Sequence, residues 1–115
     1  MTIKPLTLAL MILASACKRT ESPANLKARE IWLENQKVVE SAALGRRVDL
    51  DRFIGATKFF GELASIHVPG DHSPMIYWYP TSETSKAVEP LRRWYRANGS
   101  RLYWDPTSHK VLLSP

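Results

Sequence analysis

An apolar run begins the chain, ahead of any pattern typical of a folded domain. The segment from Leu6 to Leu13 is apolar apart from one threonine, follows Lys4 and leads into the small residues Ala14-Ser15-Ala16. A basic start, a short apolar stretch and a small-residue site are typical of a secretory signal. The run is too short to span a bilayer, which takes about 20 residues. We therefore expect residues 1–16 to be an export signal.

A first amphipathic helix is predicted between Pro23 and Gly45. Ser22 is a good N-cap residue and proline is suited to the first helical turn, while glycine is typical just after a helix. Apolar residues alternate with charged residues at helical spacing in this segment; they are Leu26, Ile31 or Trp32, Val38, Val39, Ala42 and Ala43. The pattern predicts one buried and one solvated face.

A second helix is indicated by the clearest apolar stripe in the chain. Asp49 or Asp51 is suited to cap it. The stripe recurs in steps of three and four residues, through Phe53, Ala56, Phe60, Leu63 and His67. With a short connection at Gly45–Val48, the two helices form an antiparallel hairpin.

The remaining patterns predict one more helix and several short strands. A turn-rich break covers residues 68–74, and the aromatic segment Met75–Tyr79 favours a strand. A third helix is predicted from near Pro90 to Asn98, with Leu91, Trp94 and Tyr95 on one face and Gly99 ending it. Finally, Arg101–Trp104 and Lys110–Leu113 flank a five-residue turn, Asp105–His109, as in a β-hairpin.

These elements predict a small single α+β domain over residues 23–115. It consists of an N-terminal helical hairpin, a third helix and a C-terminal β-hairpin, with Met75–Tyr79 as an additional short strand. That strand would join the hairpin in a three-stranded antiparallel sheet, since an isolated hairpin is marginal on its own.

The only cysteine changes the picture of the N-terminus. Cys17 directly follows the small residues, so the segment reads Ala14-Ser15-Ala16-Cys17. A lone exported thiol has no disulfide partner and is open to oxidation. The segment resembles the signal of bacterial lipoproteins, in which the cysteine sulfur receives a diacylglyceryl group and the peptide is cut just before it. The resemblance covers residues 1–18 and implies nothing about the fold that follows.

This resemblance implies a lipid anchor on Cys17, a tether over residues 17–22 and stable attachment by two or more acyl chains. Lys18, in place of the aspartate that retains such proteins at the inner membrane, implies the outer membrane of a Gram-negative host, facing the periplasm. Ala14 departs from the leucine that the family prefers. The alternative is ordinary cleavage after Ala16, which would give a soluble periplasmic or secreted protein.

Charge argues against nucleic acid as a partner. Removal of the first 16 of 115 residues leaves 99, and the loss of Lys4 lowers the net charge from +5 to +4. A nucleic-acid binder usually concentrates its basic residues on one element and is more basic overall. Here the base-rich positions are spread along the chain, at Lys18-Arg19, Arg46-Arg47, Arg52, Arg92-Arg93, Arg96 and Arg101.

Motifs for catalysis are not evident in the sequence. It contains no Gly-x-Ser-x-Gly segment and no glycine-rich phosphate loop. His67, Asp71 and His72 lie close together in sequence, but their spacing is not that of a helical metal-binding pair. We expect no cofactor, no metal and no enzymatic activity. A metal-dependent enzyme that uses the Asp71/His72 loop is the alternative.

Arginines are interspersed among the aromatic residues between Tyr77 and Trp104, and this segment is the candidate binding face. Tyrosine, tryptophan and arginine are the usual hot-spot residues of interfaces. Aromatic core packing explains the same composition without a binding function. The candidates are Trp78, Trp94, Trp104, Arg93 and Arg96, and we expect at least one of the three tryptophans to be exposed beside an arginine. The sequence thus predicts a small lipid-anchored envelope protein with a binding or accessory role. The partner is an envelope protein or, alternatively, an envelope glycan.

Overall fold

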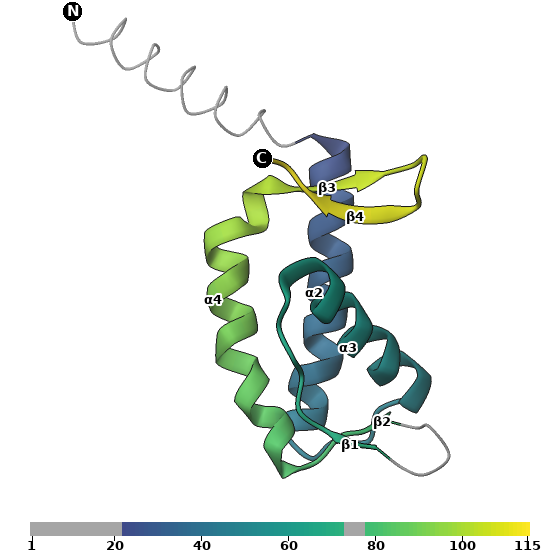
Figure 1. The fold of residues 1–115 in the computed structure, drawn as a ribbon, viewed down its shortest axis with the longest axis vertical. Helices are drawn as coiled ribbons and strands as arrows, with labels where there is room; N and C mark the ends of the chain where they lie inside the picture. The colour runs from purple at the N-terminus through teal and green to yellow at the C-terminus, as the bar shows by residue number, and fades with distance from the viewer. Residues whose placement is uncertain (1–21, 73–77) are drawn as a thin grey trace, which may run out of the picture.

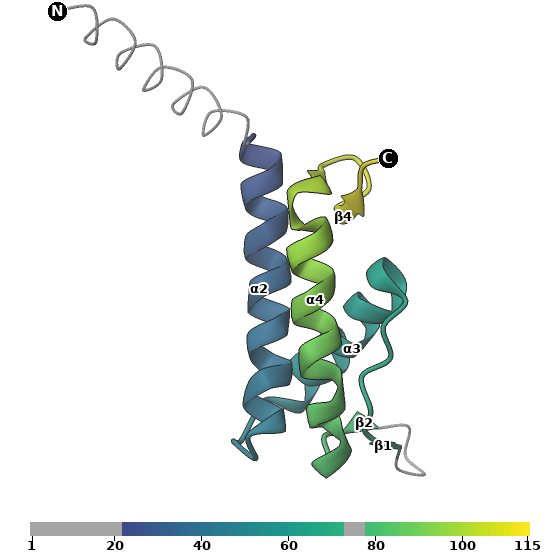
Figure 2. The ribbon, with the colours of Figure 1, turned by 90° about the vertical axis from the view of Figure 1, so that its left-hand side faces the viewer.

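The helix α2 (Pro23–Ala43) is the axis on which the other elements pack. The computed structural model describes residues 22–72 and 78–115, without the side chains of His72 and Trp78. Helix α4 (Val88–Asn98) runs antiparallel beside α2, and α3 (Leu50–Ala64) crosses its C-terminal half (Figures 1 and 2). The hairpin of β3 (Leu102–Asp105) and β4 (Lys110–Leu113) covers the N-terminal half of α2. The predicted α+β class is confirmed.

Both predicted ends of α2 are confirmed. The Ser22 hydroxyl accepts a hydrogen bond from the Asn25 N–H at 3.1 Å, and Pro23 occupies the first turn, where its missing N–H costs nothing. At the other end, Gly45 has φ of +74° and donates to the Ala42 carbonyl, while the Arg46 N–H donates to Ser41. This pair of bonds is the Schellman motif, which satisfies carbonyls that the helix leaves unpaired.

The buried face of α2 differs from the predicted face at its first turn. Its buried residues are Asn25, Ala28, Trp32, Val39 and Ala42. Leu26, which the apolar pattern placed in the core, is 46% exposed. Because neighbouring positions on a helix are 100° apart, only one of Asn25 and Leu26 can face the hairpin, and the hydrogen bonds of Asn25 decide which.

Helix α3 buries the predicted residues Phe53, Ala56 and Phe60. Asp49 is the N-cap residue, although its side chain makes no capping hydrogen bond. The helix ends at Ala64 because Ser65 is left-handed, with φ of 55°. The predicted stripe is therefore wrong at its last member, His67, which lies beyond the helix with its side chain exposed.

Helix α4 is extended at its start by the 3-10 helix η1 (Ser82–Ala87). Thr81 and Thr84 form a capping box, and the buried Thr84 hydroxyl also donates to the Pro69 carbonyl at 2.7 Å. At the other end, Gly99 does not turn left-handed but continues into the 3-10 helix η2 (Gly99–Arg101). A Cβ at Gly99 would lie 3.1 Å from the Tyr95 ring, so packing explains this glycine better than backbone conformation.

The strands form two separate antiparallel pairs, so the predicted three-stranded sheet is wrong. β2 (Trp78–Tyr79) pairs with β1 (Asp71–His72), and β3 pairs with β4. The eleven residues of α4 lie between β2 and β3, and at 1.5 Å per residue they carry the chain about 16 Å away. Figure 1 shows the two pairs at opposite ends of the molecule. Met75, Ile76 and Tyr77 lie outside the described residues.

The C-terminal hairpin is confirmed, with a turn one residue shorter than predicted. Asp105 pairs with Lys110, so four residues connect the strands. The Asp105 carboxylate accepts hydrogen bonds from the Thr107 N–H and the Ser108 hydroxyl. Both bonds favour the charged form, and they lower the pKa of Asp105, with the hydroxyl bond the larger cause.

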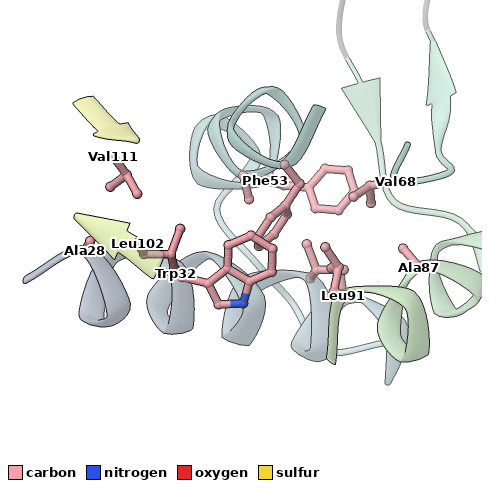
Figure 3. Close-up of a cluster of buried hydrophobic side chains, with 12 residues drawn as sticks. Ala28, Trp32, Phe53, Val68, Ala87, Leu91, Leu102 and Val111 are labelled. Atoms are coloured by element: carbon pink, nitrogen blue, oxygen red, sulfur yellow. The ribbon is translucent and has the colours of Figure 1, made fainter. Parts of the chain in front are cut away.

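An aromatic cluster around Trp32 forms the middle of the core (Figure 3). The Trp32 ring stacks on Trp94 with centroids 4.6 Å apart and planes 10° apart, and Phe60 meets it edge-on at 4.6 Å. Trp32 and Phe60 are fully buried, which confirms Phe60 as a core residue. No helix in the described part of the chain has both the length and the apolar character needed to cross a membrane.

Candidate functional site

A cleft of about 490 Å³ opens between α2, α3 and the C-terminal hairpin. Helix α2 contributes one aliphatic residue to it, α3 contributes three residues and the hairpin contributes the rest. Its lining consists of Ile31, Phe59, Glu62, Leu63, Trp104, His109, Lys110, Val111, Leu112 and Leu113. The volume lies within the range of ligand-binding pockets.

The apolar floor of this cleft follows from helix and strand periodicity. Phe59 and Leu63 are four residues apart and share one face of α3, next to the face that Phe60 buries against Trp32. Trp104 and Val111 are opposite each other in the hairpin, so their side chains lie on the same side of it. Phe59 and Trp104 remain half-buried, so each has apolar surface that no described residue covers.

Trp104 is the tryptophan of the cleft lining and is flanked by a cation. The Lys27 ammonium lies 4.2 Å from the centroid of its ring, within range of a cation–π interaction. The His109 ring approaches it edge-on at 6.2 Å. Lys27 and Ile31 are four residues apart on α2, which brings this lysine to the cleft side of the helix.

Within the part of the chain that the structure describes, the backbone of β4 is unpaired along its outer edge. The Ser114 N–H donates to the Arg101 carbonyl at 2.8 Å, which makes these two residues a hydrogen-bonded pair. Hydrogen-bonded pairs alternate along an antiparallel ladder, so Lys110 and Leu112 bond to β3, whereas Val111 and Leu113 direct their N–H and C=O groups away from it. Among residues 22–72 and 78–115, no strand pairs with that edge.

The predicted binding residues do not come together at one place. Trp104 lines the cleft, but Trp94 is stacked on Trp32 in the interface between α2 and α4. Arg93 is exposed on α4, and Arg96 on the same helix donates to Glu89 at 3.1 Å.

The predicted exposed tryptophan beside an arginine is not found at Trp94 or Trp104. Both rings are partly buried, and the cation over Trp104 is a lysine of α2. The side chain of Trp78 lies outside the described part of the chain.

The Asp71/His72 pair lies in β1, at the end of the molecule opposite the C-terminal hairpin (Figure 1). His109, in the turn of that hairpin, is therefore remote from it. Within the described residues, no group of three histidine, cysteine, aspartate or glutamate side chains is arranged to hold a metal ion. Cys17, the predicted lipidation site, lies outside the described residues.

A polar relay joins α2 to α4 on the side away from the cleft. The Trp32 indole N–H donates to Gln36, whose amide donates to Glu40, and Glu40 accepts a hydrogen bond from Arg92 at 2.7 Å. The hydrogen bond and the charge of Glu40 raise the pKa of Arg92. This relay holds the two helices together.

Sequence reasoning missed Phe59, Lys27 and the polar contact of Asn25. The adjacent aromatic residues Phe59 and Phe60 were a signal for an aromatic residue outside the core, because a helix that buries one of two adjacent residues points the other about 100° away.

Comparisons with family models, curated proteins and solved structures gave no match to the chain. The cleft is therefore interpreted from its own geometry.

Proposed function

We propose that this protein is a small lipid-anchored envelope protein with a non-enzymatic binding role, and that the cleft beside Trp104 is its binding site. One observation supports the assignment of the cleft as the binding site. In the described part of the chain, the cleft combines a half-buried tryptophan, an apolar floor and an unpaired strand edge, all on helices and strands of the fold. Apolar pockets with a few polar groups at the rim are typical of binding sites.

The anchor is supported by the sequence Ala14-Ser15-Ala16-Cys17 and by the position of the domain's first helix. The hairpin that borders the cleft is bonded to the first turn of α2, through Asn25 and Leu102. From Cys17 to Ser22 a fully extended chain reaches at most about 20 Å. A lipid on Cys17 would keep this end of the domain near the membrane surface, and Lys18 favours the outer membrane.

An apolar partner suits the cleft better than the alternative glycan partner. Sugars stack on an open aromatic face, but Lys27 lies over one face of Trp104. The other lining side chains are mostly aliphatic, and the polar ones are Glu62, His109 and Lys110. Apolar side chains of an envelope protein match this lining more closely.

Fractionation and mass spectrometry test the anchor. Wild-type protein should label with radioactive palmitate and sediment with membranes, and Cys17→Ser should lose the label and become soluble. Mass spectrometry should find a lipid-modified Cys17 at the mature N-terminus. An unmodified cysteine or a retained Met1 contradicts the lipid anchor.

Photo-crosslinking in cells tests the binding site. A photoreactive residue at Glu62, in the cleft, should give a discrete crosslinked product that Leu63→Glu removes. The same residue at Arg93, exposed on α4, is the matched control and should give none. Equal products from both positions would place the partner elsewhere.

A further inference from the structure

We infer that the partner of the cleft is an extended peptide segment that adds to the outer edge of β4 as a third strand. This inference rests on the proposed function of the cleft as a binding site. The segment has apolar side chains at alternate positions and an acidic residue beside Lys110. Strand addition of this kind is a recurrent mode of peptide recognition.

The hydrogen-bonding groups for such a strand are in place. Val111 and Leu113 each direct one N–H and one C=O to the outer edge, two residues apart along β4. A neighbouring strand offers its own groups at the same two-residue repeat. Four backbone hydrogen bonds therefore form without movement of the hairpin.

The position of α3 supplies the floor for the added strand. Helix α3 is in contact with β4, and adjacent strands lie about 4.8 Å apart, so a third strand next to β4 lies over α3, in the cleft. Its inward side chains would contact Phe59 and Leu63, which are only partly buried. Its outward side chains would face solvent, which explains why apolar residues are needed at alternate positions only.

The charges around the cleft indicate the acidic residue of the peptide. Lys110 is exposed at the start of β4, opposite Asp105, and Lys27 lies over Trp104 on the other face of the hairpin. In the described part of the chain, no ion pair involves either lysine. Glu62 is the single carboxylate of the cleft lining. Lys110 is the lysine of the cleft lining, so an acidic side chain is the complementary residue at the Lys110 end of the peptide.

Two other occupants fit the observations less well. An acyl chain would fill the apolar floor but would leave the backbone groups of Val111 and Leu113 without partners. A second copy of the domain would bring a hairpin and its helices against a cleft of about 490 Å³, which has room for a short segment only.

The test uses the full-length Cys17→Ser protein, labelled with nitrogen-15, and a synthetic acetylated heptapeptide of sequence Asp-Val-Thr-Leu-Thr-Val-Ser. On saturation, hydrogen exchange at the Val111 and Leu113 amides should slow at least tenfold, while Leu112, already bonded to β3, changes little. The same peptide with N-methyl groups on alternate residues should not bind. This control alters no protein residue and so remains valid if a cleft variant fails to fold. Arg93→Glu should bind as the parent does, and Leu63→Glu should not.

The other outcomes overturn the inference in distinguishable ways. If decanoate binds and shifts Phe59 and Leu63 without protecting the two amides, the cleft is an acyl-chain site. If the amides are protected without peptide, and sedimentation shows dimers that form with concentration, the occupant is a second copy. In both cases the cleft still binds, and the proposed function stands. If no ligand binds and the crosslinking at Glu62 is also negative, both the inference and the proposed function fail.

Discussion

The side-chain amide of Asn25 donates a 2.7 Å hydrogen bond to the backbone carbonyl of Leu102, which is 77 residues away. The same amide lies 3.3 Å from the carbonyls of Gly99 and Ser100. Asn25 is 7% exposed, so these bonds are shielded from water. One polar residue in the first turn of α2 thus fixes the path of the chain from α4 into the hairpin, and with it the position of the cleft.

Asn25→Ala should reduce the free energy of unfolding by about 2–3 kcal/mol, because it leaves buried carbonyls without a donor. Urea denaturation measures the loss. Asn35→Ala is the matched control, since its amide bonds only to the Ile31 carbonyl one turn back, and it should cost less than about 1 kcal/mol. Equal losses would mean that the Asn25 contact adds nothing beyond local helix stability.

Asn25→Asp should give a pH-dependent loss. A carboxylate would face the three carbonyl oxygens that now accept hydrogen bonds, so folding raises the pKa of the new carboxyl. The charged form is the disfavoured one, and the variant should therefore be least stable at neutral pH and recover as the pH falls towards 4. A loss of stability that is the same at pH 4 and pH 7 would contradict this role.

The local features of the fold were predictable from sequence, but the contacts between distant segments were not. Ser22-Pro23 and Gly45 marked the ends of α2, and the stripe through Phe60 marked the buried face of α3, because caps and periodicity depend on neighbouring residues. The exchange of Leu26 for Asn25 on the buried face could not be predicted, since it depends on carbonyls 74 to 77 residues away.

The same limit applies to the candidate site. Trp104 was identified from composition, but its neighbours Lys27 and Phe59 come from other helices and are set by tertiary packing. Trp94 carried the same compositional signal and is a core residue. Hot-spot composition does not distinguish the two, because an aromatic residue is equally suited to a core and to an interface.

Phe60→Ala should cost about 3–5 kcal/mol of stability, because the ring is fully buried against Trp32 and its removal leaves a cavity. Leu26→Ala, at an exposed position, is the control and should change stability by no more than about 0.5 kcal/mol. Chemical denaturation followed by circular dichroism checks both. A small effect at Phe60 together with a large effect at Leu26 would mean that the helix faces are exchanged.

Two glycine substitutions should have opposite signs. Gly45 has φ of +74°, which an alanine adopts only with strain, so Gly45→Ala should cost about 1–2 kcal/mol. Gly55 lies inside α3, and a Cβ there would meet no atom within 4 Å apart from its chain neighbours and its own helix backbone, so Gly55→Ala should stabilise by about 1 kcal/mol. Thermal unfolding measures both changes. If Gly55→Ala also destabilises, α3 is not an ordinary helix at that point.

The pKa of Asp105 should lie below that of an ordinary aspartate, because its charged form accepts bonds from the Ser108 hydroxyl and the Thr107 N–H. A lowered folded-state pKa means that the carboxylate stabilises the hairpin above the ordinary pKa, and that this contribution is lost as the pH falls through the lowered value. Nuclear magnetic resonance titration of the carboxyl carbon measures the shift. Ser108→Ala should raise the pKa, whereas Thr107→Ala, which keeps the backbone donor, should leave it nearly unchanged.

Trp94→Ala and Trp104→Ala should separate the core tryptophan from the cleft tryptophan. Trp94 stacks on the fully buried Trp32, so its loss should destabilise the domain by about 2–4 kcal/mol without removing peptide binding once the protein is folded. Trp104 lines the cleft, and its loss should cost less stability but should weaken binding of the heptapeptide at least tenfold, because it removes apolar contact area from the lining of the site. Urea denaturation and titration calorimetry measure the two effects. Iodide should quench the fluorescence that Trp104 contributes more than that of Trp94 in the free protein, and the peptide should protect the former. If Trp104→Ala binds the peptide as the parent protein does, Trp104 contributes nothing to recognition, and the binding surface lies along α3 or outside the cleft.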